Sequence, residues 1–454
     1  MKRLMFVLLC LGCFSVLFHI QAQAAVSKNP ATAISTDGEL DPDFGSGGIV
    51  TTNFGTDFDF GNAVAIQNDG KIIMAGSLYN GANGDIGLVR YLADGTLDAT
   101  FGNNGKVITD FNGRHDKANA MALQPDGRIV VAGASYLQAS NEQDFAVVRY
   151  NSDGTLDLTF SGDGYTFTDM GANFDTAFDV VIQPDGRIVV AGVAEHNGQA
   201  DMAVARYLAD GTLDSSFDED GKVVTNLGSA FDRALGVALQ SDGKIVAAGH
   251  YHNGDSLDFA LVRYKTDGSL DLDFDGDGVV TTDIDEIDND GHDVLVQSDG
   301  KIVVVGYTFA TAQNDGIFTM VRYASDGSLD SAFGDNGIVL TPVGSTDVGN
   351  GVAQQVDGKL VLVGDSWNGT DIDVAVVRYL PNGTPDPDFG SGGIVTTDIE
   401  GGQNGAMAVA FQADGKIVVA GNKTIGNNSD MGVMRYLVEP IVVENPVYIP
   451  LLIR

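Results

Sequence analysis

The sequence predicts an all-β protein, a single seven-bladed β-propeller with four antiparallel strands in each blade. The first observation is composition: the 454 residues include 59 Gly and 62 acids, and the acids are 54 Asp and only 8 Glu. Asp and Gly favour turns, whereas Glu favours helices. The second observation is an internal repeat of 57 to 59 residues, and the third is the presence of four short strand-like runs in each repeat.

The repeat is marked by Asp-Gly followed by a basic residue and an apolar run. Seven copies lie within residues 37–437, which gives about 57 residues per unit. That length exceeds most solenoid repeats and suits a four-stranded blade, and seven such units close a ring. The Asp of each copy is Asp69, Asp126, Asp185, Asp242, Asp299, Asp357 or Asp414.

In the first unit the expected strands are 49–52, 63–67, 72–75 and 86–91. They alternate or are continuously apolar, and no segment has a period of 3.6 residues. Gly, Asn and Asp separate the runs, and Asn68-Asp69-Gly70 is a tight hairpin turn between the second and the third.

Side-chain size predicts which strand lies nearest the axis, because blades crowd together there. The run at 63–67 and several of its counterparts carry Ala or Gly at alternate positions, so we assign it as the innermost strand, A. The continuously apolar run, for example 188–191, is expected to be strand B between neighbouring blades. The strand that ends in Arg-Tyr is then C, and the half-exposed threonine-bearing strand is D.

The two ends of the repeat region predict how the ring closes. The region begins with a D-type strand at 49–52 and ends with a C-type strand at 431–436. The N-terminal strand is therefore expected to complete the seventh blade beside the C-terminal strand. This closure removes an open edge that could pair with another chain.

The charge excludes one class of partner. With 62 acidic and 25 basic residues, the formal net charge is -37 and the pI is near 4.1, whereas a nucleic-acid-binding surface must be cationic. No segment beyond residue 24 has the roughly 18 uncharged apolar residues of a membrane helix. The signatures of serine hydrolases, zinc peptidases and phosphate-binding loops are also absent.

Residues 1–24 have the pattern of a bacterial secretory signal peptide, with a basic start, an apolar centre and a small-x-small end. The mature chain is expected to begin at Ala25 and to be secreted or held at the cell surface, with lipidation at Cys13 as the alternative. Cys10 and Cys13 are the only cysteines, so cleavage leaves no thiol for disulfides, zinc ligation or nucleophilic catalysis.

Two segments flank the repeats. Residues 25–36 are expected to be an N-terminal linker. Residues 438–454 form an apolar tail whose Pro440, Pro446 and Pro450 exclude a regular helix or a central strand. We expect the tail to lie extended on the propeller or to act as a sorting signal.

Three stretches carry a family resemblance. The pattern DGSLDxxFGxxGxVxT is represented by 267–281, where Asp275 replaces its second Gly; AxAxQxDGKIVVAG is represented by 238–249, and DFAVVRY occurs at 144–150. The unit resembles the delta-60 repeats of secreted bacterial β-propeller proteins, over residues 37–437. The resemblance implies the fold and export, and it implies neither a general activity nor catalytic residues.

Residues that recur in all seven units are expected to be structural, because a ring of one residue type cannot by itself form a specific asymmetric site. An Arg precedes Tyr in every C strand, and a Lys or Arg follows every Asp-Gly. Six of these Arg have an Asp five residues earlier. That odd spacing puts the two on opposite faces of a strand, so each is expected to pair with a neighbouring strand or blade. The bases are Arg90, Arg149, Arg206, Arg263, Arg322, Arg378 and Arg435, with Lys71, Arg128, Arg187, Lys244, Lys301, Lys359 and Lys416.

The strand order also predicts two different faces. The D-to-A and B-to-C loops share one end of the ring and vary in sequence, whereas the A-to-B and C-to-D turns share the other end and repeat. The five histidines after the signal and the single Trp are assigned to the variable loops, so an extracellular glycan or protein ligand is expected on that face. The candidate ligand-binding residues are Trp367, His196, His250, His252 and His292.

One patch of the variable face also predicts a metal site. His250 and His252 leave the fourth blade where Asp288, Asp290 and His292 enter the fifth, so the two loops should be neighbours. Imidazole and carboxylate together could hold a divalent metal. A solvated acidic loop is the alternative.

A second candidate metal site lies on a repeating turn. Asp273, Asp275 and Asp277 have the 1, 3, 5 spacing and the following glycine of a calcium loop. Ile284 stands where an EF-hand has its bidentate acid, so a plain turn is the alternative. We therefore expect no required cofactor, with Ca²⁺ or another divalent metal as the candidate ion.

Two functions from different classes remain. The first is a secreted binding or scaffold propeller, non-catalytic and monomeric, whose ligand lies on the variable face. The alternative is a propeller enzyme such as a metal-assisted lyase or a carbohydrate-active enzyme, which uses His196, His250, His252 and His292. Stoichiometric metal in the purified protein would favour the enzyme.

Overall fold

The computed structural model describes most of residues 37–439. The expected signal peptide, the linker 25–36 and the tail from residue 440 lie outside the described residues. The chain separates into two units, residues 1–35 and 36–454, and the fold below belongs to the second. The described stretches are 37–55, 58–171, 173–196, 198–228, 231–285, 287–309, 315–426 and 428–439.

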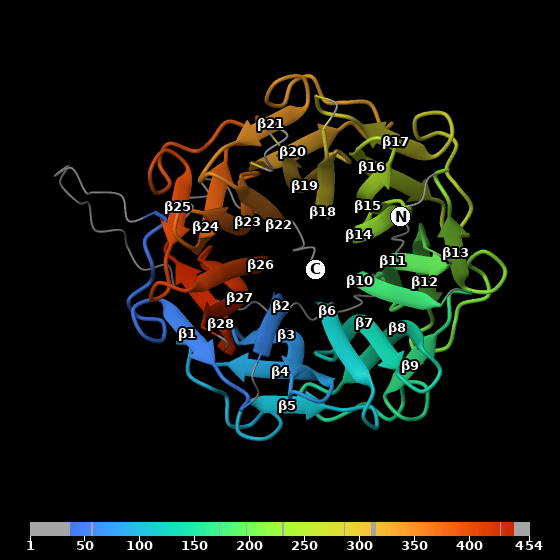
Figure 1. Ribbon diagram of the computed structural model, residues 1–454, viewed down its shortest axis with the longest axis horizontal. Helices are drawn as coiled ribbons and strands as arrows, with labels where there is room; N and C mark the ends of the chain where they lie inside the picture. Colours follow the sequence, from blue (N-terminus) through green and yellow to red (C-terminus); the bar gives the residue numbers. More distant parts are fainter. Residues whose placement is uncertain are drawn as a thin grey trace, which may run out of the picture. The chain divides into compact units, whose positions relative to one another are not determined.

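The described residues form 28 strands and no helix, in seven four-stranded blades around a central axis (Figure 1). No helix in these stretches is therefore long and apolar enough to cross a membrane. The innermost strands, A, are β2 (Phe58–Ile66), β6 (His115–Leu123), β10 (Phe174–Ile182), β14 (Asp232–Leu239), β18 (Asn289–Val296), β22 (Asp347–Gln354) and β26 (Gln403–Phe411). The B strands are β3 (Ile72–Tyr79), β7 (Ile129–Leu137), β11 (Ile188–His196), β15 (Ile245–His252), β19 (Ile302–Phe309), β23 (Leu360–Trp367) and β27 (Ile417–Ile425).

The two outer strands of each blade follow the predicted order. The C strands are β4 (Gly84–Tyr91), β8 (Glu142–Tyr150), β12 (Gln199–Tyr207), β16 (Leu257–Tyr264), β20 (Gly316–Tyr323), β24 (Ile372–Tyr379) and β28 (Asn428–Tyr436). The D strands are β5 (Lys106–Thr109), β9 (Tyr165–Thr168), β13 (Lys222–Thr225), β17 (Val279–Thr282), β21 (Ile338–Thr341), β25 (Ile394–Thr397) and β1 (Ile49–Thr52). The seven-bladed architecture predicted from the repeat is confirmed.

The N-terminal strand completes the last blade. β1 pairs antiparallel with β28, with Ile49 opposite Met434 and Thr52 opposite Met431. The pairing continues outside the strand, because the Arg435 N–H donates to the Gly48 carbonyl at 2.9 Å. Figure 1 shows the blue β1 beside the red β28, so the two ends of the repeat region share one sheet as predicted.

The core lies between the blades. Seven clusters of buried apolar side chains each join two neighbouring blades, and the cluster of blades 7 and 1 contains Phe44, Met74 and Val418. Each interface also contains a polar contact. The buried Tyr that ends a C strand forms a hydrogen bond with the Thr that ends the D strand of the preceding blade. Tyr150 and Thr109 are 2.8 Å apart at their oxygens, and Tyr91 and Thr52 make the same contact across the closure at 2.6 Å.

The recurring Arg forms a structural stack, as expected. Arg263 Nε donates to Asp271 Oδ2 at 2.7 Å, its guanidinium lies 4.3 Å from the centre of the Phe274 ring, and Lys244 pairs with the same carboxylate. The carboxylate partner is the Asp eight residues later, because the C-to-D connection folds back along its own strand. The Arg263 guanidinium also donates to the Ser325 carbonyl of the next blade, which confirms the expected pairing with a neighbouring blade. The same Arg, Asp and Phe arrangement recurs at Arg90, Arg149, Arg206, Arg322, Arg378 and Arg435.

The inner strands are longer than predicted. The apolar pattern of the first unit suggested a start at Ala63, but the hydrogen-bonded ladder begins at Phe58. The assignment of the histidines to loops was therefore wrong: His250 and His252 lie in β15 and His292 lies in β18. Backbone pairing continues here through polar residues, which a search for apolar runs does not detect.

Candidate functional site

A β-bulge occurs at the same position of every A strand. The bulged residue has no partner on strand B, which frees its side chain from the alternation of the sheet. In three blades the residue is an Asn that donates to the next A strand; Asn119 Nδ2, for example, donates to the Ala177 carbonyl at 2.7 Å. The other blades depart from this pattern. In blade order the bulged residues are Asn62, Asn119, Phe178, Leu235, His292, Asn350 and Met407.

Two further positions near each bulge also break the repeat. They face each other in the register of strands A and B, two residues before the bulge, toward the variable end of the blade. Polar side chains gather in the second half of the ring. The A-strand residues are Phe60, Lys117, Thr176, Arg233, Asp290, Val348 and Gly405, and their B-strand partners are Ser77, Ala134, Val193, His250, Tyr307, Asp365 and Asn422.

These positions build a connected set of groups across blades 4 to 6, which we call the inner polar cluster. The His250 imidazole and Asp290 Oδ1 are 2.5 Å apart, and His292 Nε2 lies 3.4 Å from Asp290 Oδ2. His292 Nδ1 is 3.1 Å from Asn350 Oδ1, and Asn350 Nδ2 donates to a backbone carbonyl of blade 7 at 2.9 Å. The cluster comprises His250, Asp290, His292, Tyr307, Asn350 and Asp365.

Tyr307 and Asp365 extend the cluster on either side of His292. The Tyr307 hydroxyl lies 3.4 Å from Asp290 Oδ2, and its ring meets the His292 ring edge-on with centres 5.4 Å apart. Asp365 Oδ1 accepts the Ala406 N–H at 3.0 Å. His292, Asn350 and Asp365 are all partly exposed, so solvent reaches groups that are otherwise held in fixed positions.

The cluster contains groups with shifted pKa values. Burial acts to raise the pKa of Asp290, but hydrogen bonds from His250 and His292 outweigh it and lower that pKa. Burial acts to lower the pKa of His292, and the Asp290 carboxylate reverses this and raises it. Burial raises the pKa of Asp365 to about 6. The cluster therefore pairs an imidazolium with a carboxylate and holds a second carboxyl group that can exchange protons near neutral pH.

The structure brings together part of the predicted metal patch. His250, Asp290 and His292 meet, whereas His252 and Asp288 make separate local contacts. His252 Nδ1 accepts the Gly254 N–H at 3.1 Å, and Asp288 Oδ1 accepts the Leu257 N–H at 2.9 Å. A metal here stays a prediction, and the two Asp290 oxygens already face different imidazoles.

The remaining candidates for ligand binding, Trp367 and His196, are each the last residue of a B strand. Trp367 is partly exposed at the last position of β23, where its backbone N–H donates to the Thr346 carbonyl at 2.8 Å. His196 ends β11, and its side chain lies outside the described residues. Two further aromatic side chains lie at this face: Tyr79 ends β3 and is 40% exposed, and Phe231 directly precedes β14 and is 41% exposed.

The second predicted metal site is an exposed turn. Asp273, Asp275 and Asp277 are exposed, and the Val279 N–H donates to Asp277 Oδ1 at 2.9 Å. Asp275 has a φ of 49° and its N–H bonds to the next blade. A residue with positive φ whose N–H bonds to the next blade recurs in the other units, at Gly45, Gly102, Ser161, Asp218, Gly334 and Gly390. The recurrence explains the turn without an ion. Calcium at this turn stays a prediction.

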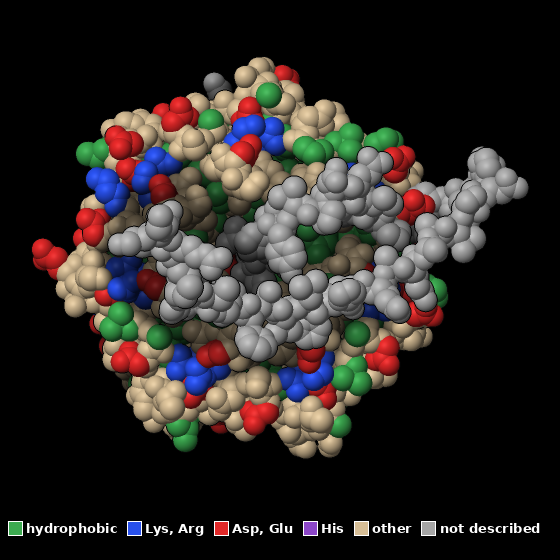
Figure 2. All heavy atoms as spheres, turned by 180° about the vertical axis from the view of Figure 1, so that it is seen from behind, with side chains coloured by type: hydrophobic (Ala, Val, Ile, Leu, Met, Phe, Trp, Pro, Cys, Tyr) green, Lys and Arg blue, Asp and Glu red, His purple; other side chains and the backbone are tan. Residues whose placement is uncertain are grey.

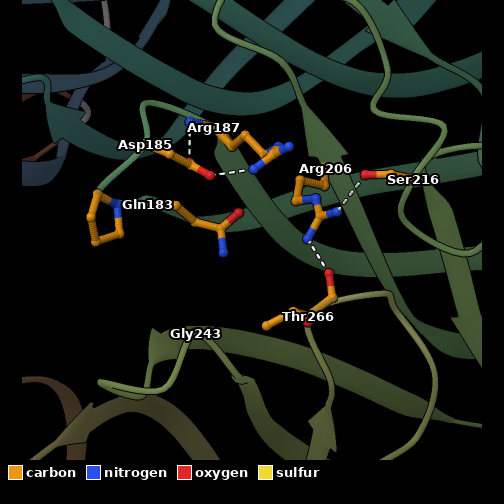
Figure 3. A pocket seen from close by; sticks show the side chains of 8 residues that line it. Gln183, Asp185, Arg187, Arg206, Ser216, Gly243 and Thr266 are labelled. Atoms are coloured by element: carbon orange, nitrogen blue, oxygen red, sulfur yellow. Dashed lines mark hydrogen bonds and ion pairs between the residues drawn. The ribbon is translucent and has the colours of Figure 1, made fainter.

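A pocket of about 370 Å³ lies at the other end of the ring, between the turns of blades 3 and 4 (Figure 3). Its lining includes Gln183, Arg187 and Arg206, which have counterparts in every blade. Figure 2 shows a face of the molecule on which Lys and Arg side chains are spaced around the ring beside acidic ones. Because this pocket is built from repeating residues, it offers less distinctive chemistry than the inner polar cluster.

Sequence reasoning missed Tyr307, Asn350 and Asp365. The sequence-based search followed the histidines and the single Trp, and none of these three positions holds either residue. A usable signal was present, because the first three units carry the small or apolar residues Ser77, Ala134 and Val193 where Tyr307 and Asp365 stand. Departure from the repeat is therefore a better indicator of the site than position in a loop.

The fold is a seven-bladed β-propeller with four strands in each blade, closed by the N-terminal strand. It carries one irregular polar cluster. Comparison with family models agrees. The chain belongs to the family described as a domain of unknown function (DUF5122), a β-propeller. The matched residues are 67–101, 124–160, 183–217, 240–274, 297–333, 355–389 and 412–438.

Several solved structures are similar to this chain in fold. A catalytically inactive virginiamycin B lyase from Staphylococcus aureus, solved with quinupristin, is 12% identical with a TM-score of 0.50, over 86% of this chain and 99% of that one. A polysaccharide lyase of family 25, an ulvan lyase, is 14% identical with a TM-score of 0.45, over 86% and 96%. YCF48 bound to a D1 peptide is 10% identical with a TM-score of 0.44, over 89% and 100%. No curated protein sequence matches the chain.

Proposed function

We propose that this protein is a secreted binding propeller whose ligand, a polar group of a glycan or protein, contacts the variable face at the inner polar cluster. The observation that carries the proposal is the break in sevenfold symmetry. An asymmetric ligand needs positions that differ between blades, and the three irregular positions concentrate His, Asp, Asn and Tyr in blades 4 to 6. Their fixed, partly exposed polar groups suit orientation of a ligand.

Aromatic side chains support the same face. Trp367, Tyr79 and Phe231 are at least partly exposed at strand ends around the ring, and such rings pack against sugars or apolar side chains while their neighbours supply hydrogen bonds. Secretion rests on the signal-peptide pattern of residues 1–24 and is part of the proposal.

Substitution of the cluster tests the proposal. A glycan and peptide array of the mature chain first identifies a ligand. We expect His292→Ala combined with Asn350→Ala to weaken its binding at least tenfold, because both groups are fixed by hydrogen bonds and partly exposed. Trp367→Ala should also weaken binding, while the thermal unfolding midpoint stays above the assay temperature.

Asn119→Ala is the matched control, since Asn119 holds the same bulge position in blade 2 but bonds only to the neighbouring strand. It should leave affinity unchanged. Normal binding by the cluster variants, together with loss of binding on changes in the turns at 94–98 or 153–157, would show that the ligand uses the other face.

Acid and base catalysis is the second candidate, and Asp365 favours it. A carboxyl group with a pKa of about 6 can donate or accept a proton at neutral pH, and the Asp290 carboxylate holds His292 nearby as an imidazolium. Such a pair suits elimination or hydrolysis of a polysaccharide. The residues present could also hold a metal through the imidazoles and carboxylates, which would polarise a substrate oxygen.

A polysaccharide panel tests this candidate by the appearance of new double bonds or reducing ends. We expect any activity to fall at least 100-fold in Asp365→Asn and to change with pH around 6, because the proton exchange is lost. Activity that survives in Asp365→Asn and in His292→Ala would rule out the cluster as catalyst. Metal analysis of the purified chain separates metal-assisted from metal-free chemistry.

A further inference from the structure

Each blade brings two residues together at the outer part of the variable face. The register places Ile86 of β4 opposite Thr109 of β5, so the next pair outward is Asp85 and Asp110. The same geometry recurs around the ring. The other pairs are Asp144 with Asp169, Asp201 with Asn226, Asp258 with Asp283, Asp373 with Asp398, and Asp430 with Asn53, while Ile317 and Pro342 hold the position in the fifth blade.

In the two pairs that combine an Asp with an Asn, the two side chains form a hydrogen bond with each other. Asn226 Nδ2 donates to Asp201 Oδ1 at 2.7 Å, and Asn53 Nδ2 donates to Asp430 Oδ1 at 2.6 Å. An amide and a carboxylate therefore fit this site without a further partner. Two carboxylates at the same place have no proton to donate to each other when both are ionised.

The first of the double-carboxylate pairs contains a third acid. Oxygens of Asp85, Asp110 and Asp116 lie within 4.8 Å of one another, and the described residues contain no other such group of three acids or imidazoles. Asp85 and Asp116 are buried, whereas Asp110 is exposed and leaves the group open to solvent. Both oxygens of Asp85 and both oxygens of Asp116 already accept hydrogen bonds from the protein. This group therefore has partners without an ion.

The pair in blade 6 supplies an independent observation. Asp373 is only 7% exposed, and its Oδ1 has no hydrogen-bond partner among the described residues. Asn368 donates only to the other oxygen, at 2.9 Å. Burial raises the pKa of the Asp373 carboxyl, and the charges that act on it are those of Asp398 and Asp371, both negative. A buried carboxylate oxygen beside two further carboxylates requires a positive partner or a proton.

The other three double pairs have a basic side chain close by. Burial raises the pKa of Asp85, Asp144 and Asp258, but His115, Arg114 and His252, in that order, act to lower it. These three pairs therefore have a basic side chain that can supply positive charge. The pair at Asp373 differs, because the charges that act on Asp373 are both negative.

We propose that Asp373 and Asp398 form a divalent-cation site of the calcium class. The buried Asp373 Oδ1 and the exposed Asp398 carboxylate supply the oxygen ligands that Ca²⁺ takes, and the exposure of Asp398 leaves room for water ligands. The ion would tie strand C to the start of the D-to-A loop, so it stabilises the variable face. This site differs from the turn at Asp273 to Asp277.

Titration of the mature, chelator-dialysed chain with CaCl₂ in a calorimeter tests the proposal. We expect one saturable site, and Asp398→Asn should remove it. The substitution copies the Asn that stands at this position in the third and seventh blades, so the variant should fold. Millimolar Ca²⁺ should also raise the wild-type unfolding midpoint more than NaCl of matched ionic strength does.

Asp169→Asn is the matched control, because its pair lies beside Arg114, and it should leave the stoichiometry at one. Asp373→Asn provides a second variant of the site and should remove the same ion. The absence of saturable binding up to about 10 mM Ca²⁺, roughly ten times the weakest dissociation constant of extracellular calcium modules, would overturn the proposal. A stoichiometry that neither Asp398→Asn nor Asp373→Asn changes would also overturn it.

Discussion

Deletion of residues 25–54 is expected to cause aggregation or a loss of more than about 10 °C in the unfolding midpoint of the mature chain. The deletion removes β1, so one edge of β28 loses its partner. It also removes Phe44, which is fully buried between blades 7 and 1, and Asp41, which pairs with Arg435. Differential scanning calorimetry and size-exclusion chromatography measure the two effects.

Single substitutions keep this prediction testable if the deletion cannot be purified. Phe44→Ala and Phe160→Ala remove the same buried ring beneath an Arg, one at the closure and one within the continuous chain. Each should cost about 3–5 kcal/mol of unfolding free energy. A deletion variant with an unchanged melting curve and elution volume would contradict the closure.

Asp175→Asn is expected to stabilise the protein at pH 8 far more than at pH 5. Asp175 is fully buried, its Oδ1 has no hydrogen-bond partner among the described residues, and Ala194 lies opposite where blade 2 has Ser135. Burial, with the charges of Asp169 and Asp144, raises the pKa of this carboxyl to about 7. The folded state therefore holds a proton that the unfolded state releases above pH 4, and the wild type loses stability as pH rises from about 4 to 7.

The Asn variant does not titrate, so the difference in unfolding free energy between variant and wild type should grow by roughly 2–3 kcal/mol from pH 5 to pH 8. Denaturant unfolding in a chelator-containing buffer measures it. Asn already occupies this position at Asn289 and Asn404. Asp347→Asn is the control, because Asp347 accepts bonds from Val343, Gly344 and Ser366, and it should destabilise at both pH values. A pH-independent effect of Asp175→Asn would contradict the buried-proton account.

The fold could be predicted from the sequence because its causes are local and repeated. Asp-Gly turns fix the hairpins, small residues such as Ala63 mark the inner strand, and Arg-Tyr marks the third. The Arg263 partner could not be predicted from strand alternation, because Asp271 reaches it through a turn rather than across a strand. Strand ends were also missed, since backbone hydrogen bonds continue past the last apolar residue.

The candidate site could be predicted only in part. The meeting of His250, Asp290 and His292 follows from blade order alone, because consecutive blades touch. Asn350 and Asp365 come from the next blade and are oriented by a bulge and by a backbone N–H, which residue spacing does not reveal. The Asp side chains that face each other at the ends of the C and D strands likewise could not be paired from the sequence, because their pairing depends on the register between these strands.

Hydrogen exchange of the mature chain with and without the ligand identified on the array tests the central claim most directly. The account predicts new amide protection at the variable ends of β15, β18, β19, β22 and β23, which carry the inner polar cluster. It predicts no change in the Asp-Gly turns at the other end of the ring. Protection confined to those turns, with these five strands unaffected, would contradict the assignment of the functional face.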